Sequence, residues 1–384
     1  MKLPNLVKFH KLREKRFLPQ ALSAFIRCIE MRTKRVLITG IAFTCALYLA
    51  VACYSSKARL SNQFLASILE STHLAAVNTA APPIRLGCSY DWPGWWPWAI
   101  TQERKLFEAH GVNVELRWFD DYYGALEALT QGMLDANCQV FNDAVAIADQ
   151  AVNGEAVVLV TDNSDGNDKI VVTEKIETPS SLAGHQVGVE KGKLTDFLLT
   201  LILDKAGISR DVVDIQYLNT AVGAIAFATG QLDAVVAWQP DWLTALKRPN
   251  SQELLSSHDF PGAIPQVVVV TQKVIAEQAD GVQALIDTWF DTLEYIRLHP
   301  EDSEAIMLRR SRLSNTNYRR FKQGVHLLSA SENIAAFSPG ETLEHLSFTA
   351  QKAANFLIDT DEISQSPDLT DLLNGEFVRR YEPQ

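Results

Sequence analysis

Strand-like and helix-like segments alternate along the sequence from residue 84 onward. Short apolar runs rich in valine and isoleucine are typical of buried strands, and the stretches between them have the spacing of helices. The predicted strands are 84–90, 112–119, 134–141, 156–162, 169–174, 185–190, 212–218, 232–238, 253–256 and 265–271. The predicted helices are 97–110, 121–132, 142–153, 193–206, 220–230, one from about 240, and a helical pattern from 272 to 358. This alternation predicts an α/β fold built from βαβ units with right-handed crossovers.

The α/β region contains two stretches of similar sequence. Gly132–Ala136 reads GMLDA and Gly230–Ala234 reads GQLDA, and each joins a predicted helix to the strand that follows it. A glycine at the end of a helix explains such a turn by itself. The repeat also fits two doubly wound lobes that face one cleft, and 384 residues are enough for two domains. Both interpretations stay open at this point.

The N-terminal region is first basic and then apolar. Residues 36–53 read VLITGIAFTCALYLAVAC and directly follow the basic run Arg32–Arg35. This order is typical of a signal peptide or a membrane anchor. Cleavage, attachment of lipid at Cys53 and retention as an anchor all remain open, as does a start of translation at Met1 or Met31. Each option exports the rest of the chain, so we expect a periplasmic protein tethered to the membrane, or one secreted after signal cleavage.

The chain therefore divides into an export segment, a spacer and a globular part. We expect residues 1–53 to form the export signal or membrane anchor. Residues 54–83 are rich in small and polar side chains and end in two prolines, which predicts a tether. After the last helical pattern, residues 359–384 are expected to form an irregular C-terminal tail.

The charge of the exported part excludes one class of partner. Of 35 basic and 46 acidic residues, only 25 and 44 lie beyond residue 53, which leaves a net charge of about −19 there. Binding of nucleic acid requires a basic face, so no nucleic-acid partner is expected.

The sequence offers little catalytic or metal-binding chemistry. It contains no GxSxG, HExxH or CxxC motif, and its histidines lack metal-ligand spacing. We therefore expect neither an enzyme nor a bound cofactor. Cys88 and Cys138 each lie within a predicted strand, where they are either small buried hydrophobes or partners in a disulfide.

Polar and aromatic residues gather where the predicted strands end, which is where doubly wound sheets bind ligands. The candidate ligand-binding residues are Asp91, Trp92, Trp95, Tyr122, Asn142, Asp143, Asp165, Asp168, Lys193, Trp238 and Gln239. Caps explain part of this pattern, because Asp121, Asn142 and Asn219 directly precede predicted helices. Caps do not explain the tryptophans, since small polar residues would serve at these junctions. A core between the lobes is the alternative explanation for them.

Several of these stretches resemble one family of transport proteins. They are SYDWPGWWPW (89–98), EKIETPSSLAGHQVGVEKG (174–192), SDGNDKIVV (164–172) and LDAVVAWQPD (232–241). They look like the substrate-binding proteins of ABC importers in the nitrate/sulfonate/taurine group, and most like the subgroup found beside urea or guanidine carboxylase systems. The resemblance covers about residues 84–358.

The resemblance implies both an architecture and partners. The family has the type II periplasmic-binding-protein fold, in which two lobes joined by two crossings close on a ligand. Lobe I would comprise residues 84–175 plus 264–358, and lobe II residues 176–263. The partners would be a small-molecule solute and the permease and ATPase subunits of an ABC transporter. The N-terminal segment would provide contact with the membrane.

The residue types favour a nitrogen-rich ligand. The candidate residues include many carboxylates, few lysines and no arginine, which suits a guanidine- or urea-like solute stacked between aromatic rings. Trp92, Trp95 and Trp238 would form stacking walls, and Asp165 and Asp168 would face a cation. Asn142 and Gln239 would supply neutral hydrogen bonds, while Asp91 remains open between a ligand contact and a turn residue. Trp96 and Trp98 are expected to be packing residues.

Three alternatives remain at the level of the sequence. Helix N-termini that point into a cleft favour anions, so the same transport role for a sulfonate, taurine, nitrate or bicarbonate is the first. A membrane-anchored sensory binding protein is the second. A binding protein or enzyme related to thiamine-pyrimidine synthesis is the third, although the cysteine-rich motif of those relatives is missing here.

Overall fold

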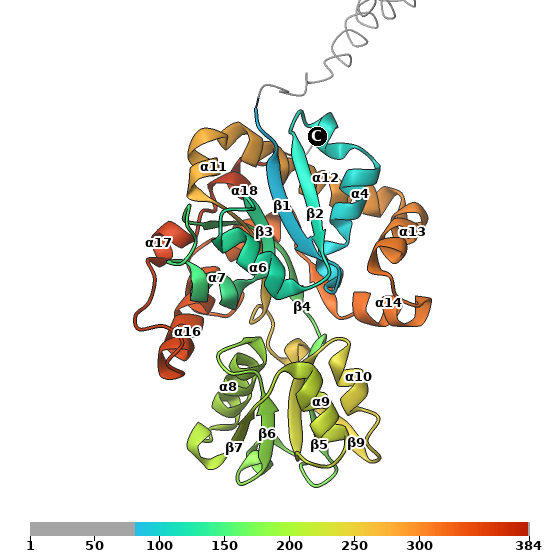
Figure 1. The fold of residues 1–384 in the computed structure, drawn as a ribbon, viewed down its shortest axis with the longest axis vertical. Helices are drawn as coiled ribbons and strands as arrows, with labels where there is room; N and C mark the ends of the chain where they lie inside the picture. Colours follow the sequence, from blue (N-terminus) through green and yellow to red (C-terminus); the bar gives the residue numbers. More distant parts are fainter. Residues whose placement is uncertain (1–80, 383–384) are drawn as a thin grey trace, which may run out of the picture. The chain divides into compact units, whose positions relative to one another are not determined.

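The computed structural model describes residues 81–382 (Figure 1). Six strands form one sheet in the order β11-β4-β10-β3-β1-β2. Their bounds are β1 Ile84–Ser89, β2 Val114–Phe119, β3 Ala136–Val140, β4 Ala156–Ser164, β10 Pro265–Val270 and β11 Val325–Leu327. Strand β1 is parallel to β2 and β3, whereas β10 runs antiparallel to both β3 and β4. The first lobe, as the term is used below, is this sheet with the helices that pack on it.

Five further strands form a second sheet in the order β7-β6-β8-β5-β9, which with its helices is the second lobe. Their bounds are β5 Asp168–Thr173, β6 Gln186–Val189, β7 Asp214–Tyr217, β8 Ala234–Trp238 and β9 Ser251–Ser256. The division expected after residue 175 puts β5 in the first lobe. That placement is wrong, because β5 is hydrogen-bonded to β8 and β9. The chain therefore crosses between the sheets at residues 165–167, and it returns between β9 and β10.

Helices join most of the strands. In the first lobe they are α4 Pro97–Glu103, α5 Leu106–Ala109, α6 Tyr122–Thr130, α7 Phe141–Ile147, α11 Gln272–Glu277, α12 Ala279–Leu298, α13 Pro300–Ser311, α14 Asn315–Lys322, α15 Ala330–Ala336 and α16 Leu346–Asp359. In the second lobe they are α8 Leu194–Ala206, α9 Thr220–Ala228 and α10 Asp241–Ala245. Short 3-10 turns are η1 Pro93–Trp95, η2 Pro179–Leu182, η3 Arg210–Val212 and η4 Ser257–Asp259. The α/β fold predicted from the sequence is confirmed.

The C-terminal tail is more regular than expected. It contains α17 (Leu369–Leu372) and α18 (Glu376–Arg380), and Leu373 forms a bridge to Val157 of β4. Burial of Phe377 explains the order, since an aromatic side chain packed in the core anchors a short helix that could not persist alone.

Local sequence explains how the helices begin and end. Asp121 and Asn219 cap α6 and α9, and their side chains accept hydrogen bonds from the amides of Gly124 and Val222, both at 2.9 Å. The expected cap at Asn142 is wrong, because α7 begins one residue earlier and Asn142 lies inside it.

The open question about the two strand cysteines is settled. Cys88 of β1 and Cys138 of the neighbouring β3 are joined by a disulfide, with their Cα atoms 4.9 Å apart. Both side chains are fully buried. Disulfides are typical of oxidising compartments outside the cytoplasm.

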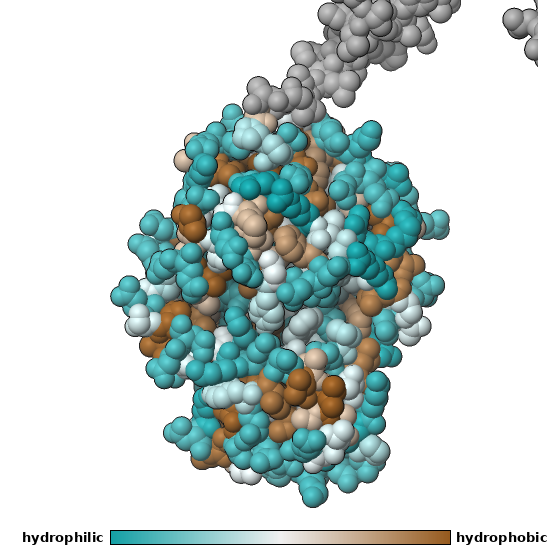
Figure 2. Space-filling model, viewed as in Figure 1, coloured by the Kyte–Doolittle hydropathy of each residue, from teal (hydrophilic) through white to brown (hydrophobic). Residues whose placement is uncertain are grey.

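The surface seen in Figure 2 is largely hydrophilic, with apolar side chains gathered over the second lobe. The exposed apolar residues of that lobe include Val222 and Ile225 of α9. Within residues 81–382, no helix is both long enough and apolar enough to cross a membrane. The expected export signal or anchor at 1–53, with Cys53, and nearly all of the expected tether at 54–83 lie outside the described residues.

Candidate ligand-binding site

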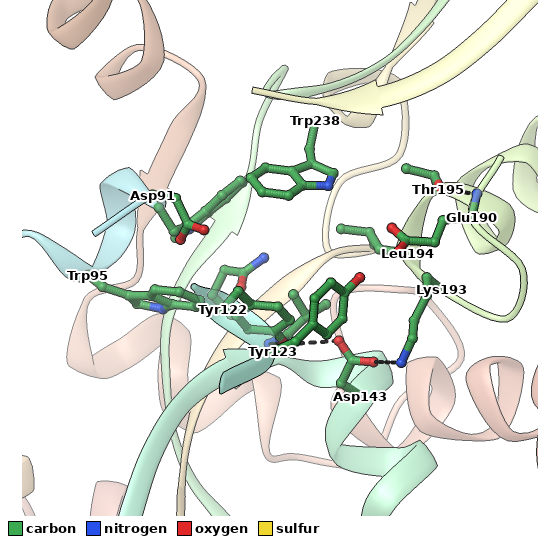
Figure 3. Close-up of a pocket in the computed structure, with 13 residues that line it drawn as sticks. Asp91, Trp95, Tyr122, Tyr123, Asp143, Glu190, Lys193, Leu194, Thr195 and Trp238 are labelled. Atoms are coloured by element: carbon green, nitrogen blue, oxygen red, sulfur yellow. Dashed lines mark hydrogen bonds and ion pairs between the residues drawn. The ribbon is translucent and has the colours of Figure 1, made fainter. Parts of the chain in front are cut away.

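A cavity is lined by residues from both lobes, at the ends of β1, β3, β6 and β8 and at the start of β10 (Figure 3). The lining residues are Asp91, Trp92, Trp95, Tyr122, Tyr123, Val140, Asp143, Glu190, Lys193, Leu194, Thr195, Trp238 and Gln266. Seven of the eleven sequence-predicted site residues lie in this set: Asp91, Trp92, Trp95, Tyr122, Asp143, Lys193 and Trp238. Two lobes with a shared cavity are the arrangement that a hinge-closing binding protein requires.

The turn after β1 is anchored to a buried carboxyl group. The indole Nε1 of Trp92 donates a hydrogen bond to Oδ1 of Asp162 at 2.8 Å, and the Thr161 hydroxyl donates to Oδ2 at 2.8 Å. Gly94 makes this approach possible, because a Cβ there would come within 1.8 Å of Asp162 Oδ2. Burial raises the pKa of Asp162 to about 7, although both hydrogen bonds favour the charged form.

Aromatic rings form the apolar wall of the cavity. Trp95 stacks on Tyr122 with ring centroids 5.9 Å apart, and Trp92 packs at a tilt against Trp95 at 6.4 Å. Trp238, at the end of β8, faces these rings from the second lobe (Figure 3). A flat solute can therefore contact aromatic faces contributed by both lobes.

The other two tryptophans of the segment 89–98 have a different role. Trp96 stacks on Tyr318 at 5.2 Å, and Trp98 packs against Trp289 at 4.7 Å. Both are almost fully buried and neither lines the cavity. The prediction that Trp96 and Trp98 are packing residues is confirmed.

An ion pair connects the two lobes across one side of the cavity. Lys193, just before α8, donates to Oδ1 of Asp143 on α7 at 3.0 Å. The Tyr122 hydroxyl donates to the other oxygen of Asp143 at 2.8 Å and accepts from the Val140 amide at 3.0 Å. Burial acts to lower the pKa of Lys193, but the Asp143 carboxylate outweighs it and the pKa is raised. Lys193 is thus a neutralised cation and not a free one.

The remaining charges of the cavity are acidic. Asp91 accepts a hydrogen bond from the Ser89 hydroxyl at 2.6 Å, and burial raises its pKa to about 6. Burial also raises the pKa of Glu190. Among the described lining residues, three carboxyl groups therefore face one lysine, and that lysine is already paired.

Four predicted site residues lie outside the cavity lining. Asp165 is in the crossing and pairs with His258, and Asp168 is fully buried and accepts a hydrogen bond from Ser164. Neither side chain lines the cavity, so neither position matches the expectation of a carboxylate that faces a cationic ligand. Asn142 is buried inside α7, and the Gln239 amide donates to the backbone oxygen of Asp91 at 3.0 Å. Gln239 therefore links the lobes beside the cavity.

Sequence reasoning missed several lining residues, and Gln266 is the most informative. It is the second residue of β10, which runs antiparallel to its neighbours, so the beginning of this strand lies beside the ends of β3 and β4. A search limited to the carboxyl ends of strands cannot find it. Glu190 is the last residue of a predicted strand and Thr195 lies in the first turn of the predicted helix that follows, so both lie at a junction that the search covered.

The described residues were also compared with the requirements of a metal-binding site. Within residues 81–382, no group of three or more histidine, cysteine or carboxylate side chains is placed to hold a metal ion.

The sequence matches the model of a known protein family. The family model described as NMT1/THI5 like matches residues 92–303, which is more than half of the chain. The chain belongs to the NMT1/THI5-like family. A candidate binding protein of Brucella abortus (strain 2308) is 26% identical to this family member over 297 residues, covering 76% of this chain and 92% of the relative.

Solved structures show that this NMT1/THI5-like protein has the periplasmic-binding-protein fold. The periplasmic aliphatic sulphonate binding protein from Escherichia coli superposes with a TM-score of 0.62 at 19% identity, covering 79% of this chain and 97% of that one. The ligand-binding component of an ABC-type import system from Staphylococcus aureus, with zinc bound, gives 0.61 at 13% identity, covering 79% and 100%. The desulfurization enzyme DSZB gives 0.53 at 14%, covering 77% and 97%. The fold therefore serves both binding proteins and an enzyme.

Proposed function

We propose that this protein is the extracytoplasmic solute-binding component of an ABC importer. It captures a small, nitrogen-rich polar solute, guanidine- or urea-like, in the cavity between the lobes and delivers it to the permease and ATPase subunits. The fold shared with binding proteins and the cavity lined by both lobes support the transport role. The disulfide between Cys88 and Cys138 supports a location outside the cytoplasm.

The charge of the cavity carries the proposal about the ligand. Asp91, Asp143 and Glu190 line the cavity, and Lys193 already forms an ion pair with Asp143. An anionic solute would have to displace Asp143 from Lys193 or bind beside unpaired carboxyl groups, and both are unfavourable in a partly buried site. A flat nitrogen-rich solute instead meets aromatic faces and hydrogen-bond acceptors.

A sulfonate is the second candidate. The sulphonate-binding protein of Escherichia coli has the same fold, and Lys193 would be free to bind an anion if Asp143 turned away. An enzymatic role, suggested by the DSZB fold, receives less support. The described lining residues include no cysteine, serine or histidine, so catalysis there would depend on its carboxyl, lysine, tyrosine or threonine side chains.

Ligand screening tests the proposal. The purified protein is mixed with guanidine, urea, small amines, taurine, alkanesulfonates, nitrate and bicarbonate, and its melting temperature is measured for each. A solute that binds only the folded state raises the melting temperature by mass action. We expect guanidine- or urea-like solutes to do so. Stabilisation by sulfonates or inorganic anions alone would show that the ligand assignment is wrong.

A further inference from the structure

Two side chains that line the cavity have polar atoms without hydrogen-bond partners. Gln266 is fully buried, and neither its amide oxygen nor its amide nitrogen is hydrogen-bonded. The indole Nε1 of Trp95 is likewise buried and unpartnered, although Trp95 is 1% exposed and stacked in place on Tyr122. A buried polar group without a partner is unfavourable by about tenfold or more in an equilibrium constant, so a group that enters the cavity and pairs with these atoms would be favoured.

The position of Gln266 gives its side chain little freedom to find another partner. It lies on β10 between Val140 of β3 and Asp162 of β4, opposite each of them in the sheet. Val140 is apolar, and the Asp162 carboxyl group accepts hydrogen bonds from Trp92 and Thr161 but none from the Gln266 amide. The amide therefore faces the cavity with one acceptor and two donor hydrogens available.

The solutes considered above differ in how well they satisfy these atoms. Guanidinium offers donors only, so it would leave the Gln266 nitrogen and the Trp95 indole without an acceptor. A sulfonate offers acceptors only, so it would leave the Gln266 oxygen without a donor. A ureido or primary carboxamide group presents a carbonyl oxygen beside N–H groups and satisfies all three sites. Such a group is also flat and neutral, which suits the aromatic wall and the acidic lining.

We propose that Gln266 is the specificity-determining residue of the cavity, and that with Trp95 it selects a neutral solute carrying a hydrogen-bond donor beside an acceptor. Urea-type and primary amide groups belong to this class. The inference rests on the proposed binding function and narrows its ligand class. It separates urea-like from guanidine-like solutes, which the charge of the cavity alone does not.

Calorimetric titration of the full chain with three small probes tests the inference. The probes are urea, guanidinium and methanesulfonate, which differ in their donors and acceptors. We expect urea to bind about tenfold or more tightly than either of the others, since one unpartnered buried group costs about a factor of ten or more.

Variants of Gln266 then locate the selection. Gln266→Met keeps the size and removes both polar atoms, so it is expected to weaken urea binding about tenfold. Gln266→Glu replaces the donor by a second acceptor and is expected to shift the preference toward guanidinium. Gln139→Met is the matched control, because Gln139 is equally buried on neighbouring β3 but does not line the cavity. The melting temperature of each unliganded variant reports its folding.

Each outcome bears on the inference in a defined way. Tightest binding of guanidinium to the native protein leaves the proposed function standing and overturns the role of Gln266. Urea binding that Gln266→Met leaves unchanged, or that Gln139→Met weakens equally, also overturns it. Binding of methanesulfonate alone contradicts both the inference and the nitrogen-rich ligand of the proposed function, and supports its second candidate. Binding of none of the probes contradicts the inference and the proposed ligand class. If Gln266→Met does not fold, the probe ranking of the native protein and of Gln266→Glu decides.

Discussion

Glu155 carries a buried carboxyl group that has no role in the cavity. It directly precedes β4, is 4% exposed, and neither of its carboxyl oxygens has a hydrogen-bond partner. Burial raises its pKa to about 8, whereas an unfolded chain gives glutamate a pKa of about 4.3. The unfolded state therefore loses this proton first as the pH rises. The contribution of Glu155 to the free energy of unfolding is therefore fully present below about pH 4, and it is lost as the pH rises to about 8.

Glu155→Gln should remove this loss of stability. The variant is expected to gain free energy of unfolding over the native protein by up to about 1.4 kcal/mol per pH unit between about pH 4 and 8, with little further gain above. Denaturant unfolding at several pH values measures the difference. Glu277→Gln, at an exposed position of α11, is the control for the substitution itself. A gain independent of pH would contradict the account of Glu155.

Individual residues differ in how far the sequence reveals their role. The sequence distinguishes cavity tryptophans from packing tryptophans in the segment after β1. Pro97 begins α4, so Trp98 lies inside a helix that must bury one face. The role of Gln266 could not be predicted. The sequence PQVVVV does not show that this strand runs antiparallel, so it does not show that Gln266 lies beside the ends of other strands. Asp165 and Asp168 looked equivalent to the other candidate carboxylates, and only the structure shows that neither lines the cavity.

At the scale of elements, the η1 turn depends on one glycine. Gly94 lies against the buried carboxyl group of Asp162, and a Cβ would come within 1.8 Å of Oδ2 and 2.1 Å of Cγ. Asp162 cannot move aside without losing its hydrogen bonds to Trp92 and Thr161. Gly94→Ala is therefore expected to lower the free energy of unfolding by about 1–3 kcal/mol, as overpacking does elsewhere.

Gly281→Ala in α12 is the matched control. The nearest atom to its added Cβ is Ile84 Cδ1 at 3.4 Å, which is an ordinary contact. Alanine is the better helix former, so this variant should be neutral or more stable by up to about 1 kcal/mol. Denaturant unfolding of both variants measures the difference. Equal stability of the two variants would show that the η1 turn adapts to a side chain.

Ten strands were predictable, several of them as apolar runs rich in β-branched residues between turn residues, and all ten are present. Strand β11 was not, because it has three partly or fully exposed residues within a helical region. The sheet to which β5 belongs was also missed. A strand's sequence indicates that it pairs, but hydrogen bonds to distant strands decide its partners.

At the scale of the whole molecule, the lobes are held together by contacts around the cavity. Lys193 pairs with Asp143, Gln239 donates to the backbone of Asp91, and Lys191 pairs with Glu362 at 3.1 Å. With these contacts in place, the described lining residues of both lobes surround one shared cavity. A solute bound there would touch both lobes at once, which is how a binding protein couples capture to closure.

The most direct measurement is a crystal structure of the protein with the best solute from the ligand screen. Our account predicts that the solute lies between Trp95 and Tyr122 of the first lobe and Trp238 of the second, within hydrogen-bond distance of Gln266. Electron density for the solute at any other site, with this cavity holding only solvent, would contradict it.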